Sequence, residues 1–302
     1  MVDIKTRISR IKLENPLFLA SGILGQTSDS MENVLKSGMG GVVTKSIGKE
    51  PREGHPNPTM IETEHGLLNA MGLPNPGIDA FLKELKNLSR ESKPIIGSVF
   101  AGDKEDFIEL SMKMEKSGVD AVELNLSCPH AEGYGAAIGT EPELVSKIVE
   151  SVKNQTNIPI FAKLPPFSDI IDVAVAAEKA GSDAIVAINT IQAMAINFET
   201  RKPFLGNKAG GYSGPAIKPI GLKCVYDIYQ NVDIPIVGCG GITYGRDALE
   251  YIIAGASALQ IGSAIYYRGK DAGALIVDEM KTIMEKEGIK SLVELIGSAQ
   301  QF

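Results

Sequence analysis

The chain has 302 residues, with 30 lysines and arginines against 37 aspartates and glutamates, and 44% of its residues are hydrophobic. This apolar content supports a folded core and argues against an intrinsically disordered chain, while the net charge of -7 argues against a nucleic-acid-binding surface. The 3 cysteines are too few for the disulfide framework of a secreted scaffold, or for the four thiolates of a common iron–sulfur cluster.

Eight short apolar runs alternate along the chain with longer amphipathic segments. The runs predict strands at 18–23, 41–45, 94–101, 121–128, 158–164, 183–190, 234–242 and 258–266. The segments predict helices at 78–88, 104–117, 141–152, 170–180, 220–230, 245–254 and 272–287. This order predicts an α/β fold, a (β/α)8 TIM barrel of the kind that typically takes about 250 residues, and we expect residues 1–302 to form one domain.

Glycines and loop lengths refine this prediction. Small turns at 36–41, 116–120, 179–183 and 253–257 place a glycine where a helix would end in the left-handed conformation. The alternation of apolar and polar residues over 6–13 predicts an N-terminal hairpin across the bottom of the barrel. Two segments, 46–76 and 191–217, are longer than ordinary turns and predict functional loops. The alternative, an open doubly wound sheet, lacks its glycine fingerprint, because 238–243 has no third glycine.

A soluble, cytoplasmic protein is expected. No run reaches the about 18 consecutive apolar residues of a transmembrane helix, and residues 1–7 carry charges where a signal peptide would be apolar. The histidines at 55, 65 and 130 lack helical metal-site spacing and there is no Cys-x-x-Cys, so no metal is expected.

Polar side chains gather at the ends of four predicted strands. In the fourth, period-two alternation places Glu123, Asn125 and Ser127 on one face. Lys45, Lys163 and the pair Asn189-Thr190 close three others. Because the active sites of such barrels lie at the carboxyl ends of the strands, these residues predict a convergent site there. The alternative is that each lysine simply marks the exit of a strand into solvent.

Two further features lie at the same end. Gly240-Gly241 and Gly262-Ser263 close the last two strands, where many barrels bind phosphate through backbone N–H groups, although ordinary turn glycines would look the same. Cys128 ends the fourth strand before a glycine-rich loop, which makes it a candidate nucleophile or general base. Cys224 and Cys239 fit better as small buried residues.

Four motifs in order along nearly the whole chain resemble dihydroorotate dehydrogenase, the flavin enzyme that makes orotate in pyrimidine synthesis. They are Thr44-Lys-Ser46, Asn69-Ala-Met-Gly-Leu-Pro-Asn75, Glu123-Leu-Asn-Leu-Ser-Cys-Pro129 and Ser213-Gly-Pro-Ala-Ile-Lys-Pro219. Within the family, three stretches look most like the class 1B catalytic subunit. These are Gly139-Thr-Glu-Pro142, Thr200-Arg-Lys-Pro203 and Gly210-Gly-Tyr-Ser-Gly-Pro215.

The resemblance implies roles for individual residues. Cys128 would remove the proton from C5 of dihydroorotate while a hydride leaves C6 for FMN, one FMN being bound per chain. Lys163 would lie beside the pyrimidine edge of the flavin. The substrate-binding residues would be Lys45, Asn69, Met71, Gly72, Leu73, Asn125, Asn189 and Thr190. The cofactor-binding residues would be Ser21, Lys45, Ser46, Asn125, Lys163, Ile188, Gly214, Gly240, Gly241, Gly262 and Ser263. His130 stands where many relatives have asparagine, and Ser98 stands at the position of another asparagine near the flavin.

A class 1B subunit also implies a partner. Electrons would leave FMN through a separate subunit carrying FAD and a [2Fe-2S] cluster and would reach NAD, in a heterotetramer of two catalytic and two electron-transfer chains. Three alternatives stay open at this point: a fumarate-dependent homodimer of class 1A type, a non-redox phosphate-binding barrel that uses a lysine, and a barrel that only binds a metabolite. No nucleic acid or membrane partner is expected.

Overall fold

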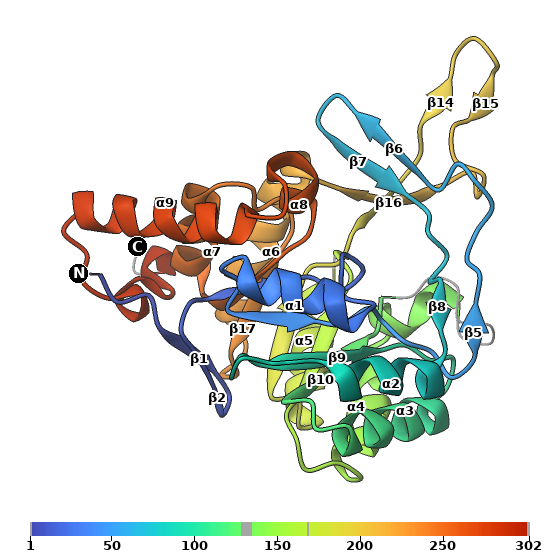
Figure 1. Cartoon of the computed structure of the whole chain (residues 1–302), viewed down its shortest axis with the longest axis horizontal. Helices are drawn as coiled ribbons and strands as arrows, with labels where there is room; N and C mark the ends of the chain where they lie inside the picture. Colours follow the sequence, from blue (N-terminus) through green and yellow to red (C-terminus); the bar gives the residue numbers. More distant parts are fainter. Residues whose placement is uncertain (1, 128–134, 168, 301–302) are drawn as a thin grey trace.

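A computed structural model describes residues 2–127, 135–167 and 169–300. Its centre is a closed barrel of eight parallel strands in the order β10-β11-β12-β17-β18-β3-β4-β9, which confirms the predicted TIM barrel (Figure 1). The strands are β3 Leu17–Leu19, β4 Gly41–Val43, β9 Ile95–Val99, β10 Ala121–Asn125, β11 Ile160–Leu164, β12 Ala184–Ala187, β17 Ile236–Cys239 and β18 Ala256–Ile261.

Helices surround the barrel. They are α1 Ser28–Lys36, α2 Ile78–Asn87, α3 Lys104–Lys116, α4 Pro142–Lys153, α5 Ile170–Lys179, α6 Lys218–Tyr229, α7 Gly245–Ala254, the short α8 Ser263–Arg268 and α9 Ala272–Lys286. The predicted turn glycines Gly38, Gly118, Gly181 and Gly255 all have positive φ, as a left-handed helix end requires. Among the described residues, no helix is long and apolar enough to cross a membrane.

Most of the predicted strands extend too far, and the first and the last show this most clearly. The first ends at Leu19 rather than residue 23, and the last ends at Ile261, after which Ser263 begins α8. The apolar run Ser-Ala-Ile-Tyr that follows Gly262 suits a strand and a buried helix turn equally well by periodicity. Gly262 follows the strand and caps the start of α8, whose Ala264 is buried. This correction places Gly262 and Ser263 at a strand-to-helix junction.

The N-terminal hairpin closes the bottom of the barrel, as predicted. Strands β1 Thr6–Ile8 and β2 Ile11–Leu13 pair antiparallel. The inward side chains Ile8, Ile11 and Leu13 join one apolar cluster with barrel residues such as Phe161. Thr6 Oγ1 donates to the Ser257 carbonyl at 2.8 Å and ties the hairpin to β18. Since this end of the interior is filled, access to the barrel is confined to the carboxyl ends of the strands.

The two long segments predicted as loops contain strands of their own. Strands β6 Met60–Thr63, β7 Gly66–Asn69, β13 Ile191–Ala193 and β16 Gly210–Ser213 form an antiparallel sheet in the order β13-β16-β7-β6. Two smaller ladders pair β5 Pro51–Arg52 with β8 Asn75–Pro76, and β14 Ile196–Asn197 with β15 Lys202–Pro203. We call the four-stranded sheet β13-β16-β7-β6 the insertion sheet. Figure 1 shows it projecting from the barrel on the side away from the termini.

Candidate active site

A layer of polar side chains lies in the barrel next to the apolar cluster that the N-terminal hairpin closes. On five of the strands, period-two alternation leads from an inward apolar residue to an inward polar one. On β9, Ile96 is followed by Ser98; on β10, Ala121 is followed by Glu123. The other inward polar members of this layer, each following an inward apolar residue in the same way, are Lys163 on β11, Cys239 on β17 and Gln260 on β18.

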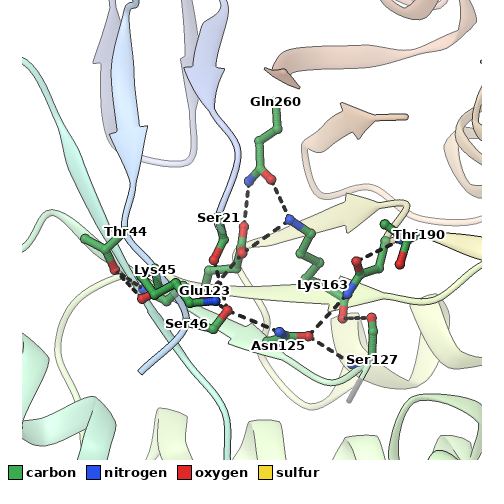
Figure 2. Close-up of polar contacts among 12 residues, drawn as sticks. Ser21, Thr44, Lys45, Ser46, Glu123, Asn125, Ser127, Lys163, Thr190 and Gln260 are labelled. Carbon is green, nitrogen blue, oxygen red and sulfur yellow. Dashed lines mark hydrogen bonds and ion pairs between the residues drawn. The ribbon is translucent and has the colours of Figure 1, made fainter. Parts of the chain in front are cut away.

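Lys163 is held by two partners in this layer. Its side chain is 6% exposed and that of Glu123 is 0% exposed, with 3.6 Å between Nζ and Oε1. Lys163 Nζ also donates to Gln260 Oε1 at 2.8 Å, and Gln260 Nε2 donates to Glu123 Oε2 at 2.5 Å (Figure 2). A buried lysine needs such pairing. Lys163 therefore does not mark an exit of the chain into solvent.

Hydroxyl and amide groups continue from this ion pair toward the mouth of the barrel. Ser98 Oγ donates to Glu123 Oε1 at 3.4 Å and lies 2.9 Å from Ser46 Oγ. Ser46 Oγ in turn lies 2.9 Å from Ser21 Oγ and accepts from Asn125 Nδ2 at 3.1 Å. The predicted residues Ser21, Ser46, Asn125 and Lys163 thus belong to one network, although they come from four different strand ends (Figure 2).

Asn125 connects this network to the end of β12. Asn189 Nδ2 donates to Asn125 Oδ1 at 3.4 Å, and the backbone N–H of Thr190 donates to Asn189 Oδ1 at 2.8 Å. Ser127 joins from the other side, because its N–H donates to Asn125 Oδ1 at 3.3 Å and its hydroxyl donates to the Lys163 carbonyl at 3.2 Å. Two asparagine amides and a threonine therefore face the mouth together.

Lys45 lies beside this network and differs from Lys163. It is half-buried, and burial lowers the pKa of its ammonium group. Among the described residues its ammonium makes neither an ion pair nor a hydrogen bond. The hydroxyl of the preceding residue, Thr44, accepts a hydrogen bond from the Ser98 N–H at 2.9 Å. A half-buried cation of this kind is suited to an anionic group of a small molecule.

The insertion sheet brings Asn69, at the end of β7, to Thr190, which follows barrel strand β12. Asn69 Nδ2 donates to the Gly211 carbonyl at 3.3 Å. A Cβ added at Gly211 would lie 2.1 Å from Thr190 Oγ1, so the sheet rests directly on Thr190. Met71, Gly72 and Leu73 continue from β7 toward a neighbouring loop, where the His55 N–H donates to the Met71 carbonyl at 3.0 Å. The part of these three residues in binding a substrate stays a prediction.

The predicted phosphate-binding residues form a glycine-lined wall. Gly214, Gly240 and Gly241 all have positive φ, and a Cβ at Gly241 would lie 2.8 Å from the Gly214 carbonyl oxygen. The side chain of Ile188 lies against Gly240. Around Gly262, by contrast, a Cβ would meet nothing closer than 3.7 Å, from Ala20 and Ile23. Gly214, Gly240 and Gly241 are buried, and with no side chain of their own they allow close approach to their backbone.

Several site residues were missed or fall outside the described residues. Gln260 was not singled out, although it interrupts an apolar strand as Glu123 does and the same alternation argument could have found it. Glu123 was placed on the polar face without a role, and Ser98 without a partner. Cys128 and His130 lie outside the described residues, so the structure describes the chain only as far as Ser127 on this side.

Comparison with known proteins identifies the family. The model of the dihydroorotate dehydrogenase family matches residues 3–284. The chain belongs to the dihydroorotate dehydrogenase family. It is 50% identical over 303 residues to "Dihydroorotate dehydrogenase B (NAD(+)), catalytic subunit" of Methanocaldococcus jannaschii, covering 99% of this chain and 98% of that protein. It is 51% identical to the protein of the same name from Pyrococcus furiosus, covering 99% and 100%.

The fold agrees with a solved structure of a more distant relative. The dihydroorotate dehydrogenase of Eimeria tenella, in complex with ferulenol, superposes with a TM-score of 0.86 and 23% identity, covering 99% of this chain and 89% of that one. At this identity the match supports the fold rather than the roles of individual residues. The resemblance found in the four sequence motifs is therefore confirmed at the level of the family.

Proposed function

We propose that this chain is the FMN-binding catalytic subunit of a class 1B dihydroorotate dehydrogenase, oxidising dihydroorotate to orotate in the synthesis of UMP, with residues 1–302 as one FMN-binding domain. The observation that carries the proposal is the assembly of Lys163, Asn125 and Asn189 into one connected network at the open end of the barrel. A buried cation and two amides suit a flavin and a planar amide substrate stacked on it.

The described residues fit FMN in two respects. The glycine wall of Gly214, Gly240 and Gly241 has no side chains of its own, which lets a phosphate approach the backbone N–H groups there. Lys163 supplies a fixed positive charge deeper in the barrel. FMN, when bound, accepts a hydride and gains negative charge at its pyrimidine edge, which a nearby ammonium stabilises. Ser21, Ser46, Ile188, Gly262 and Ser263 complete the proposed cofactor site.

Substrate binding is assigned to the residues nearer the mouth. The amides of Asn69, Asn125 and Asn189 can both donate and accept, as the ring amides of dihydroorotate require. Lys45, with its ammonium free of protein partners among the described residues, suits the substrate carboxylate. Thr190, Met71, Gly72 and Leu73 would close the ring in from the insertion side, which orients C6 toward the flavin.

The catalytic base is assigned to Cys128. Ser127, the last described residue before it, is anchored to Asn125 and to the Lys163 carbonyl. Cys128 follows Ser127 directly in the sequence. A thiolate at this position would take the C5 proton while the hydride leaves C6, and a positioned base of this kind contributes about 10²–10⁴ in rate. Ser127 thus acts by holding the chain at the substrate.

A partner subunit is suggested by two of the relatives, which are named as the catalytic subunit of an NAD(+)-linked dihydroorotate dehydrogenase. We propose that electrons leave through a cytoplasmic partner that carries FAD and a [2Fe-2S] cluster, in a heterotetramer of two chains of each kind. Cys224 is buried and Cys239 lies within the barrel. We therefore assign the cluster to the proposed partner rather than to these two cysteines.

One experiment tests the proposal. The purified chain should show a flavin spectrum, and dihydroorotate added without oxygen should bleach it. A colourless protein, or a flavin that dihydroorotate fails to reduce, contradicts the proposal. Turnover with fumarate and no partner protein would instead indicate a homodimer of class 1A type. A lysine adduct trapped by borohydride from a colourless protein would indicate a non-redox barrel.

A further inference from the structure

Glu123 and Gln260 hold Lys163 on two sides, and neither has a part in the proposed contacts with substrate or FMN. Glu123 is 0% exposed, Gln260 is 2% exposed and Lys163 is 5% exposed. Gln260 uses both ends of its amide, accepting from Lys163 and donating to Glu123. The second oxygen of Glu123 faces Lys163 and accepts from Ser98. Every polar end of this triad therefore has a partner.

The physical chemistry of burial makes this triad unusual. Replacing a buried ion pair with apolar residues of similar volume is often neutral or stabilising, so the pair contributes little to folding by itself. Lys163 lies in the polar layer, between the apolar cluster at the bottom of the barrel and the hydroxyl and amide groups nearer the mouth. A role that needs a fixed charge at this place accounts for the triad better than stability does.

We propose that Glu123 and Gln260 are positioning residues that hold the Lys163 ammonium in one place and keep it charged throughout reduction of the flavin. The inference rests on the proposed function, in which FMN lies beside Lys163. When the flavin takes up a hydride, its pyrimidine edge gains a negative charge. The ammonium then meets that charge without moving and without taking up a proton, because its carboxylate partner has kept it protonated.

The other titratable groups around Lys163 do not replace Glu123. Cys239 on β17 faces both members of the pair, and burial raises the pKa of its thiol, so it stays neutral near pH 7. Lys45 lies at the same mouth and is a second cation, with a pKa lowered by burial. Of the described residues hydrogen-bonded into the triad, Gln260 and Ser98 carry no charge. Glu123 is therefore the compensating anion.

The test measures the reduction potential of the bound flavin against pH in the holoenzyme. In the wild type, two electrons are taken up with one proton, at N5. In Glu123→Gln the buried ammonium loses its compensating charge, and burial favours the neutral amine in the oxidised state. Reduction then draws a second proton onto Lys163, and the pH slope of the potential doubles. Glu123→Asp keeps the charge and is expected to restore the wild-type slope.

The role of Gln260 has its own readout. Sulfite adds to N5 of oxidised flavins and leaves a negative charge on the pyrimidine edge, so its affinity reports how well the ammonium is placed. Gln260→Met is expected to weaken sulfite binding about tenfold, a change of about 1.4 kcal/mol. Ser111→Ala is the matched control, because it removes a buried hydroxyl in α3 without a hydrogen-bond partner, and both readouts should match the wild type.

The proposal is decided by the pH slope of the Glu123→Gln variant or, if that variant does not fold, by a second pair of variants. A Glu123→Gln enzyme that holds FMN, is reduced by dihydroorotate and keeps the wild-type slope overturns it. If that variant does not fold, Lys163→Met is compared with Lys163→Met/Glu123→Gln. Equal flavin potentials support action through Lys163, and unequal ones overturn it. Failure of the proposed function itself is separate, since the wild type would then hold no flavin or resist dihydroorotate.

Discussion

Gly211 presses against Thr190, so closely that a Cβ on the glycine would lie 2.1 Å from the threonine hydroxyl oxygen. The same glycine accepts a hydrogen bond from Asn69 through its carbonyl. One residue of β16 thus joins the first insertion to the end of β12. The substrate side of the site is therefore assembled by contact between two insertions that lie more than a hundred residues apart in the sequence.

Gly211→Ala should displace Thr190 while leaving the flavin side intact. A shift of about 1 Å in a positioning residue can cost on the order of 10²-fold in rate, so we expect KM for dihydroorotate to rise about tenfold or more with unchanged FMN content. Tyr212→Phe is the matched control. Tyr212 is the next residue of β16 and points to the opposite face of that strand, and the substitution removes the hydrogen bond between its hydroxyl and Thr63 on β6. Equal steady-state kinetics of the two variants would contradict the role given to Gly211.

Cys128→Ala should abolish nearly all turnover and retain FMN. Loss of a positioned general base lowers kcat by about 10²–10⁴. Because an ordinary thiol has a pKa of about 8.5 and the thiolate is the active form, wild-type activity should rise from pH 6 toward pH 9. Stopped-flow reduction of the flavin by dihydroorotate measures both. A flat pH profile, or a variant that loses its flavin, would show that the cysteine is not the base.

The affinity for orotate should fall with rising pH earlier than an exposed lysine would allow. Burial lowers the pKa of Lys45, and only its protonated form attracts the orotate carboxylate. Binding is therefore full below that lowered pKa and lost as pH rises through it. Spectral titration of Cys128→Ala isolates this effect from the thiol. Lys45→Met should remove the pH dependence, whereas Lys49→Met, at an exposed lysine paired with Asp106, should leave it unchanged.

Cys224 and Cys239 should resist alkylation in the folded protein. Burial, assisted by the charge of Asp227, raises the pKa of Cys224 to about 11, and burial also raises the pKa of Cys239. Because the thiolate is the reactive form, iodoacetamide near neutral pH should modify neither residue in the folded holoenzyme, and both after denaturation. Peptide mapping by mass spectrometry reads this out directly. Rapid modification of Cys239 in the folded protein would mean that its thiol is not held within the barrel.

Much of the barrel was predictable because its signals are local. Alternation with a period of two assigned Glu123 and Asn125 to the inner face of their strand, and both lie there. Glycine turns marked the ends of four helices, which the positive φ values confirm. The N-terminal hairpin over the barrel bottom was also predictable from alternation. The overlong last strand shows the limit, since periodicity does not separate a short strand from a helix turn.

Residue type and local periodicity therefore determined the fold class, the end of the barrel that carries the site and most of the residues facing it. Tertiary structure decided which of them touch. Gln260 bridges Lys163 to Glu123 only because barrel closure brings β18 across from β10 and β11. Gln260 and Glu123 are 137 residues apart in the sequence. The insertion sheet likewise forms only when two distant segments meet. Contacts between remote strands depend on the closure of the whole barrel, and no local pattern encodes that geometry.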